Sequence, residues 1–215
     1  LDVPLEEGVP EVGHIADRLL AIPFRQVAER GFEAHDDGTP LVVVDVETEL
    51  EFSVAEIIDA IDDVPVDFTD RGGFDSDDES YAELVRAIID DEIGQGEGAN
   101  LVIGRHYRAQ VADWGPTVAL MVLKQLLERE RGAYWTYLFF TGDRYLIGAS
   151  PERHVSVHGG DVRMNPISGT FRVPRDLDAS GVDPVTAMKP ALLDFLADEK
   201  EIYELFMVVD EELKM

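Results

Sequence analysis

The chain carries Gly148-Ala149-Ser150-Pro151-Glu152 directly after the apolar run Tyr145-Leu146-Ile147. This order predicts a strand that ends in a Ser-Pro-Glu turn and presents a carboxylic acid. In a partly apolar cleft, Glu152 would keep its proton near neutral pH and serve as a general acid. On spacing alone, the simpler interpretation is a turn carboxylate that pairs with Arg153 or Arg144.

A second strand and turn follow downstream, where Met164-Asn165-Pro166-Ile167 leads into Ser168-Gly169-Thr170. The turn offers backbone amides and two hydroxyls at a point where glycine permits unusual backbone dihedrals. Such a nest suits the carboxylate of a substrate. An ordinary turn at the end of a strand is the alternative that the pattern leaves open.

Two glutamates lie close to the end of the chain. Glu201 and Glu204 are three residues apart, so they share one face of a predicted helix. Their apolar neighbours, Ile202 and Leu205 among them, predict a largely buried helix, in which carboxylates are paired or bound to metal. Hard oxygen ligands of this kind suit Mg²⁺. Lys200 stands four residues before Glu204, so a surface ion pair is the alternative.

The charge of the chain excludes some classes of partner. With a formal net charge of -27 over 215 residues, the protein lacks the basic footprint that a nucleic-acid backbone requires. An anionic substrate must therefore be captured by local dipoles, arginines or a metal ion. No apolar run approaches the ~20 residues that span a bilayer, so no membrane role is expected. The sequence contains no cysteine, which fits a cytoplasmic protein.

The first part of the chain predicts mostly local elements. Residues 1–13 are expected to form an extended lead-in, residues 14–30 helical segments interrupted near Pro23, and residues 41–44 a buried strand. Residues 64–80 are predicted to be an exposed acidic loop. Its acidic cluster favours the N-terminus of a helix that runs from about residue 81 to 94, and a metal-binding loop is the alternative.

The rest of the chain predicts strands and amphipathic helices. A strand is expected at residues 100–105 and a helix at 116–131, with Val118, Leu120, Met121, Leu123, Leu126 and Leu127 inward. Two hairpins follow, one from 134–140 and 145–147 and the other from 154–158 and 161–164. A loop at 172–190 is expected to precede a last helix at about 190–214.

Taken together and in this order, three stretches resemble the chorismate-utilising enzymes, the family of anthranilate synthase component I and of isochorismate and salicylate synthases. They are Gly148 to Glu152, Pro166 to Thr170, and Lys200 to Asp210. Looser similarity extends back through residues 81–105. The sequences of residues 164–170 and 209–215 are most similar to those of phenazine-type enzymes, which make 2-amino-2-desoxyisochorismate.

The resemblance implies an α+β fold, the chorismate-binding fold of anthranilate synthase component I, with antiparallel sheets and outer helices. The family's fold continues well beyond the last predicted helix. Residues 1–215 are therefore expected to be the N-terminal portion of a single chorismate-binding domain, and the chain to be truncated relative to the family.

The resemblance also assigns roles to individual residues. Glu152 would be the general acid that helps the C4 hydroxyl of chorismate depart. Gly169 and Thr170, in the turn that begins at Ser168, would hold the ring carboxylate. Glu204 would be a direct or water-mediated Mg²⁺ ligand, with Glu201 bound to the metal or next to its ligands.

One departure from the family points to the nucleophile. Relatives that add water have a lysine base at the position of Asn100, and asparagine cannot act as a base. The resemblance therefore implies ammonia as nucleophile, supplied by a glutamine amidotransferase domain or subunit, with 2-amino-2-desoxyisochorismate as product. A full anthranilate synthase that releases pyruvate is one alternative, and a non-catalytic chorismate-binding homologue that acts through a partner is another. A homodimer is left open as the assembly.

Overall fold

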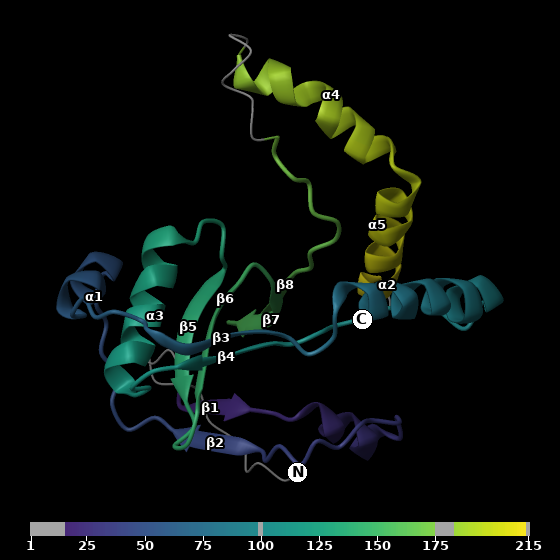
Figure 1. The fold of residues 1–215 in the computed structure, drawn as a ribbon. Coiled ribbons are helices and arrows are strands. Elements are labelled where there is room, and N and C mark those ends of the chain that lie inside the picture. Colours follow the sequence, from purple (N-terminus) through teal and green to yellow (C-terminus); the bar gives the residue numbers. More distant parts are fainter. Residues whose placement is uncertain (1–15, 99–100, 175–182, 214–215) are drawn as a thin grey trace. The chain divides into compact units, whose positions relative to one another are not determined.

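The computed structural model describes residues 16–98, 101–174 and 183–213 (Figure 1). In chain order the elements are β1 (Arg18–Ala21), the 3-10 helix η1 (Phe24–Arg30), β2 (Val42–Asp45), α1 (Val54–Ala60), β3 (Phe68–Phe74), α2 (Asp78–Ala87), the π-helix η2 (Ile88–Glu92), the 3-10 helix η3 (Ile93–Gln95), β4 (Tyr107–Val111), α3 (Pro116–Arg129), β5 (Trp135–Phe140), β6 (Tyr145–Ser150), β7 (Arg153–His158), β8 (Asp161–Asn165), α4 (Pro184–Ala197) and α5 (Glu199–Glu212).

The described strands form two-stranded sheets, β1 with β2, β3 with β4, β5 with β6, and β7 with β8. β1–β2, β3–β4 and β7–β8 are antiparallel. This mixture of helices and antiparallel pairs confirms the α+β class, and both predicted hairpins are present as β5–β6 and β7–β8. Among the residues that the structure describes, no helix is both long and apolar enough to cross a bilayer.

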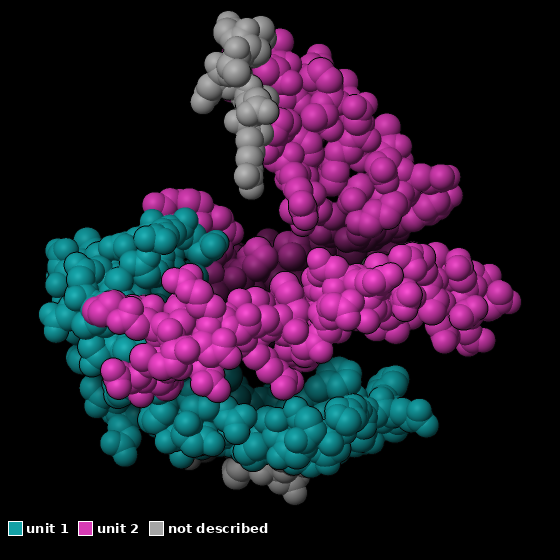
Figure 2. All heavy atoms as spheres, in the orientation of Figure 1, with its two compact units in different colours: residues 1–64, 115–130, 136–148 teal, residues 65–114, 131–135, 149–215 magenta. Residues whose placement is uncertain are grey.

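The chain divides into two compact units, each built from separate segments (Figure 2). Unit 1 comprises residues 1–64, 115–130 and 136–148, and unit 2 comprises residues 65–114, 131–135 and 149–215. The three stretches that carry the predicted chemistry therefore fall almost entirely within unit 2. The prediction that the chain forms part of a single domain stays a prediction, and its lead-in at residues 1–13 lies outside the described residues.

The core of unit 1 is centred on α3, whose predicted position is confirmed. Val118, Ala119 and Met121 are buried there, whereas Leu120 faces outward and is 41% exposed. Lys124 is also buried, and its ammonium donates to the carbonyl of Ile61 at 2.9 Å. The same ammonium pairs with Asp63 at 2.8 Å, and this bond raises the pKa of Lys124.

The prediction of helical structure throughout residues 14–30 was wrong for its first half. β1 occupies Arg18–Ala21 and pairs with β2, while a short 3-10 helix follows Pro23 as its fixed φ allows. A run of four apolar or long side chains does not distinguish a helix from a strand. Residues 18–21 form a strand because they pair with β2, which lies more than 20 residues away in the sequence.

Residues 64–80 were predicted to be an exposed acidic loop. They are mostly exposed, but the prediction of a loop was wrong for residues 68–74, which form β3. β3 pairs with β4 through a register that shifts twice. Gly72 lies so close to the backbone of Arg108 that a Cβ would stand 1.6 Å from its carbonyl oxygen, and its φ is +68°. Only glycine allows two backbones to approach so closely. Gly72, which in the sequence suggested a loop, is therefore required by the irregular pairing of this strand.

The predicted strand at residues 100–105 was also misplaced. Residues 101–106 are irregular, and the strand begins at Tyr107. Arg105 and His106 instead join a polar network at the start of α2. Asn100, the residue expected to select the nucleophile, lies outside the described residues.

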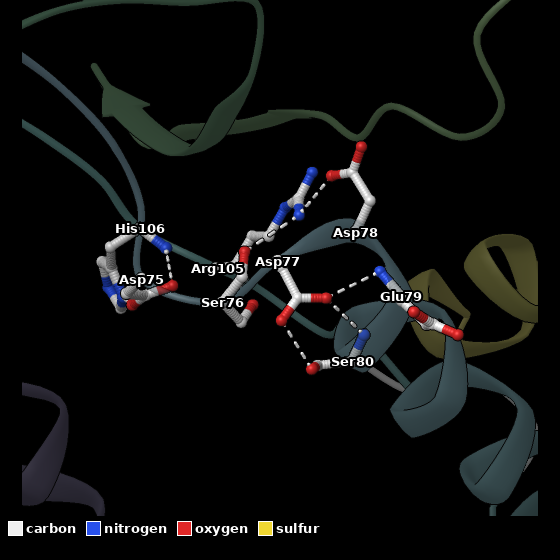
Figure 3. A network of polar contacts seen from close by, with 8 residues as sticks. All are labelled: Asp75, Ser76, Asp77, Asp78, Glu79, Ser80, Arg105 and His106. Carbon is white, nitrogen blue, oxygen red and sulfur yellow. Dashed lines mark hydrogen bonds and ion pairs between the residues drawn. The ribbon is translucent and has the colours of Figure 1, made fainter.

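The acidic cluster before α2 caps the helix as expected (Figure 3). The carboxylate of Asp77 accepts from the backbone N–H groups of Glu79 at 3.0 Å and Ser80 at 2.9 Å. Asp78 pairs with Arg105 at 2.8 Å, and the guanidinium of Arg105 lies 4.0 Å from the centre of the Phe74 ring. These contacts tie the start of α2 to the segment that leads into β4.

A single helix was predicted at about residues 190–214, but the structure has two helices there, α4 and α5. α4 starts before the predicted loop ends, with the Asp183 side chain accepting from Thr186, and includes Pro190 within it. Asp198 then separates α4 from α5, because its carboxylate accepts from the backbone N–H groups of Lys200 at 2.9 Å and Glu201 at 3.3 Å. This second cap sets where α5 begins, and with it the position of its glutamates.

The cap of α2 predicts a pH-dependent local stability. Hydrogen bonds from the backbone and side chain of Ser80 hold the pKa of Asp77 below its usual 3.8. A lowered carboxyl pKa stabilises the helix start above about pH 3.8, and this stabilisation is lost as the pH falls through the folded-state value. Hydrogen exchange at the Glu79 and Ser80 amides should therefore accelerate below about pH 3.8, after correction for intrinsic rates.

The matched variant is Asp77→Asn, because asparagine caps a helix equally well and does not titrate. Its amides should show no such acceleration over the same pH range. The same acid-dependent acceleration in Asp77→Asn would contradict the assignment of the cap to the Asp77 carboxylate.

Candidate functional site

The turn that carries Glu152 follows β6 directly, as predicted. Ser150 accepts at its carbonyl from the Tyr134 N–H at 2.7 Å, and its hydroxyl accepts from the Glu152 N–H at 3.3 Å. The side chain of Glu152 is exposed. The guanidinium of Arg153 contacts Tyr134 and Asn165, so the predicted ion pair between Glu152 and Arg153 does not form. Arg144 pairs with Asp143 at 3.6 Å.

The turn at Ser168-Gly169-Thr170 follows β8 after two residues. Ser168 and Gly169 are half-buried and Thr170 is exposed. The hydroxyl of Ser168 is buried and has no hydrogen-bond partner among the described residues. Because a buried hydroxyl without a partner costs free energy, this group is ready to bond an incoming polar ligand.

The same turn meets the first turn of α5. A Cβ built on Gly169 would stand 1.6 Å from Oε2 of Glu201 and 3.4 Å from the ring of Phe195. The Glu201 carboxylate thus occupies the space that any larger residue would fill. Its Oε2 is buried and, like the Ser168 hydroxyl, has no hydrogen-bond partner among the described residues.

The two glutamates of α5 are joined by a lysine. The ammonium of Lys200 lies 2.9 Å from Oε1 of Glu201 and 2.7 Å from Oε2 of Glu204, which confirms the alternative of an i,i+4 ion pair. The side chains of Glu201 and Glu204 are 18% and 22% exposed, against 67% for Lys200. The bonds to Glu204 and then Glu201 raise the pKa of Lys200.

A pocket of about 230 Å³ lies where these elements meet. Ser168, Gly169 and Glu201 form its polar part. Its apolar part was not predicted from the sequence and consists of Phe195, Leu196, Ile202 and Leu205. The ring of Phe195 also packs edge-on against Phe171 at 5.5 Å, just after the turn.

The structure thus brings part of the predicted site together. Ser168, Gly169 and Glu201 line one pocket, and Glu204 is joined to Glu201 through Lys200. Glu152 and Thr170 do not line this pocket. The prediction of a largely buried α5 was wrong, because its large apolar side chains are mostly exposed, namely Tyr203, Leu205, Phe206 and Val209.

The donor set suits a hard cation. Oε2 of Glu201 has no hydrogen-bond partner in the described part of the chain, and the Lys200 ammonium already lies between the carboxylates of Glu201 and Glu204. Within the described residues, no group of three or more His, Cys, Asp or Glu side chains converges on one point. Two carboxylates nevertheless fit Mg²⁺, which binds through one or two protein carboxylates and completes its shell with water and substrate.

Comparison with known proteins then identifies the family. Residues 62–214 match the family described as chorismate binding enzyme. The chain belongs to this family. The match contains both turns and α5, so the pocket lies in the part of the chain that defines membership.

Similar curated proteins support the same assignment. The chain is 46% identical over its whole length to "Anthranilate synthase, phenazine specific" of Pseudomonas chlororaphis and 44% identical to the protein of that name in Pseudomonas fluorescens. It spans 32% of the length of each of these relatives. A "2-amino-4-deoxychorismate synthase" of Streptomyces globisporus is 41% identical over 86 residues, which are 40% of this chain and 16% of the relative.

The contact between Gly169 and Glu201 leads to a test by substitution. Gly169→Ala places a methyl group where the Glu201 carboxylate lies, so this side chain must move and the turn must separate from α5. We expect the thermal midpoint to fall by a few degrees. Gly104→Ala is the matched control, because no atom of the described residues lies within 4 Å of its added Cβ, and its midpoint should stay the same or rise.

The double variant Gly169→Ala/Glu201→Ala identifies the partner. Removal of the carboxylate relieves the clash, so the two substitutions should be clearly non-additive in a double-mutant cycle of thermal denaturation. Additive losses would show that the Gly169 methyl group meets something other than Glu201.

Proposed function

We propose that the protein serves the Mg²⁺-dependent amination of chorismate at C2, with loss of the C4 hydroxyl, to give 2-amino-2-desoxyisochorismate. The observation that carries this proposal is the pocket beside Gly169, in which Ser168 and Glu201 each present a polar atom that has no hydrogen-bond partner among the residues that the structure describes. A small anionic ring fits such a site, since apolar walls cover its faces and a few polar groups orient it.

Three relatives favour amination over other chorismate chemistry. The 44–46% identical Pseudomonas proteins are named as phenazine-specific. The name of the Streptomyces relative describes chorismate with an amino group at C2 and without the C4 oxygen. Asn100 supports the same choice, because its amide cannot remove a proton from water. The ammonia would come from a glutamine amidotransferase domain or subunit.

In this reaction a bond forms between the ammonia nitrogen and C2 while the C4–O bond breaks and the ring double bonds shift. Glu152 would give its proton to the departing oxygen, which leaves as water. Its exposed position at a turn leaves the carboxyl accessible to a substrate. The Gly169 and Thr170 amides would hold the ring carboxylate and orient the C4 oxygen toward Glu152.

Glu201 and Glu204 would hold the Mg²⁺, which when bound neutralises the ring carboxylate of the substrate. The protein needs such help because it carries a net charge of -27, and a chorismate dianion is repelled by its overall field. The lack of cysteine is consistent with a reducing compartment, and a cytoplasmic location belongs to this proposal.

Product analysis tests the proposal directly. The protein, in its natural length, is incubated with chorismate, Mg²⁺ and ammonium, and the products are identified by mass spectrometry. We expect 2-amino-2-desoxyisochorismate without release of pyruvate. Anthranilate together with pyruvate would assign the full anthranilate synthase reaction instead, and no consumption of chorismate would exclude an enzyme.

The role of Glu152 is tested by Glu152→Gln, which keeps the shape of the side chain and removes the acid. We expect kcat to fall by about 10²–10⁴ while the affinity for chorismate, measured by calorimetry, changes little. Asp161→Asn, at the exposed tip of the β7–β8 hairpin, is the control and should retain kcat. Near-normal turnover in Glu152→Gln would show that another group supplies the proton.

The role of Glu204 is tested by Glu204→Gln, which removes one charged metal ligand. We expect Mg²⁺-dependent turnover to be abolished and the affinity for Mn²⁺, measured by electron paramagnetic resonance, to fall at least about tenfold. Glu199→Gln, exposed in the first turn of the same helix, should leave both unchanged. An unaltered metal dependence in Glu204→Gln would refute the ligand role.

A further inference from the structure

Arg153 follows Glu152 directly and is the first residue of β7. Its two terminal nitrogens donate to different parts of unit 2, Nη1 to the hydroxyl of Tyr134 and Nη2 to the side-chain oxygen of Asn165. Its guanidinium also lies 4.6 Å from the centre of the Tyr134 ring. A planar guanidinium of this kind holds its two partners in a fixed geometry, whereas the rotatable ammonium of a lysine does not fix their directions.

Each of the two partners of Arg153 is connected to one of the two turns of the candidate site. Tyr134 donates its backbone N–H to Ser150, so it holds the turn that carries Glu152. Asn165 ends β8 and leads through two residues to Ser168, and it is the cross-strand partner of Arg153 in the β7–β8 register. The Arg153 side chain therefore links the acid-bearing turn to the segment that enters the anion-binding turn.

One nitrogen of the Arg153 guanidinium is buried at a cost in free energy, which indicates that the contacts of the other two nitrogens hold this side chain in place. Nε of Arg153 is buried and has no hydrogen-bond partner among the described residues. A buried donor without a partner is unfavourable, so the remaining contacts must hold the guanidinium against this penalty. The two terminal nitrogens donate to Tyr134 and Asn165, and they do not pair with the adjacent Glu152 carboxylate.

We propose that Arg153 is a positioning residue that holds the Glu152 turn at a fixed distance from the Ser168–Thr170 turn and keeps its own charge away from the Glu152 carboxylate. This inference rests on the proposed function, in which Glu152 protonates the C4 oxygen of a ring anchored at Gly169. A carboxylate that is ion-paired with a neighbouring arginine has no proton to donate, and a carboxyl displaced by about 1 Å would donate its proton poorly.

The first experiment separates positioning from binding, with the protein in its natural length. Arg153→Ala should lower kcat by about 100-fold, while the KM for chorismate changes by less than about threefold. Added methylguanidinium should restore at least about tenfold of the lost kcat, because it can refill the fork. Arg163→Ala is the matched control, since Arg163 lies on the same hairpin and pairs only loosely, at 3.6 Å, with Asp161. Its kcat should be unchanged.

Single-arm variants give a second reading if Arg153→Ala folds poorly. Tyr134→Phe keeps the ring and removes the hydroxyl, and Asn165→Ala removes the other acceptor. Each should lower kcat by about tenfold, as for the loss of one hydrogen bond to a charged group. Wild-type kcat in both, or a loss in Arg153→Ala that methylguanidinium does not reverse, would overturn the inference.

Hydrogen exchange distinguishes failure of this inference from failure of the proposed function. The Tyr134 and Glu152 amides, both bonded to Ser150, should exchange faster in Arg153→Ala than in the wild type, and equally fast in Arg163→Ala and the wild type. A wild-type protein that leaves chorismate unchanged would exclude the proposed function alone. Equal exchange in Arg153→Ala and wild type would exclude the positioning role, whatever the enzyme catalyses.

Discussion

The candidate site depends on one close approach, that of the Glu201 carboxylate to the backbone of Gly169. No side chain fits between them, and the contact brings a turn after β8 against the first turn of α5. Asp198 makes this possible, because its cap ends one helix and starts the next at the residue that puts Glu201 in place. The Ser168 hydroxyl and Glu201 Oε2, which have no hydrogen-bond partner within residues 16–98, 101–174 and 183–213, then lie in the same pocket.

Electrostatics explains why the proposed chorismate site would need a cation. The chain carries 45 acidic and 18 basic residues, so the overall field repels an anionic substrate. Without a cation beside them, the carboxylates of Glu201 and Glu204 would increase the repulsion of an anionic substrate. Lys200 bridges them, and its exposed ammonium shows that the pair of glutamates attracts and orders a positive charge. A metal ion would do the same with a higher charge density and open coordination positions.

The sequence predicted those parts of the fold whose signals are local. The β5–β6 and β7–β8 hairpins, the cap of α2 at Asp77 and the position of α3 follow from turns, alternation and helix periodicity. The misplaced elements β1, β3 and β4 owe their positions to pairing between distant segments, and the Gly-rich β3 resembles a loop in composition. Such pairings are set by partners that a local pattern does not contain.

The same distinction holds within the site. Glu152, the Ser168–Thr170 turn and the glutamates of α5 were found from short motifs and their resemblance to a family. The Phe195 and Leu196 walls and the fork of Arg153 were missed, because they arise from contacts between segments far apart in the chain. Arg153 reaches Tyr134, 19 residues before it, and Asn165, 12 residues after it. An arginine beside a glutamate suggests an ion pair, and only the fold shows that this side chain is directed elsewhere.

The central claim is that chorismate binds at the turn beside Glu201, and amide chemical shifts measured during a chorismate titration of the ¹⁵N-labelled protein test it most directly. The Ser168, Gly169 and Thr170 amides should shift together and saturate with one dissociation constant, while those of Gly159 and Gly160 at the β7–β8 tip stay in place. Saturable shifts elsewhere with unmoved Ser168–Thr170 amides would contradict the account.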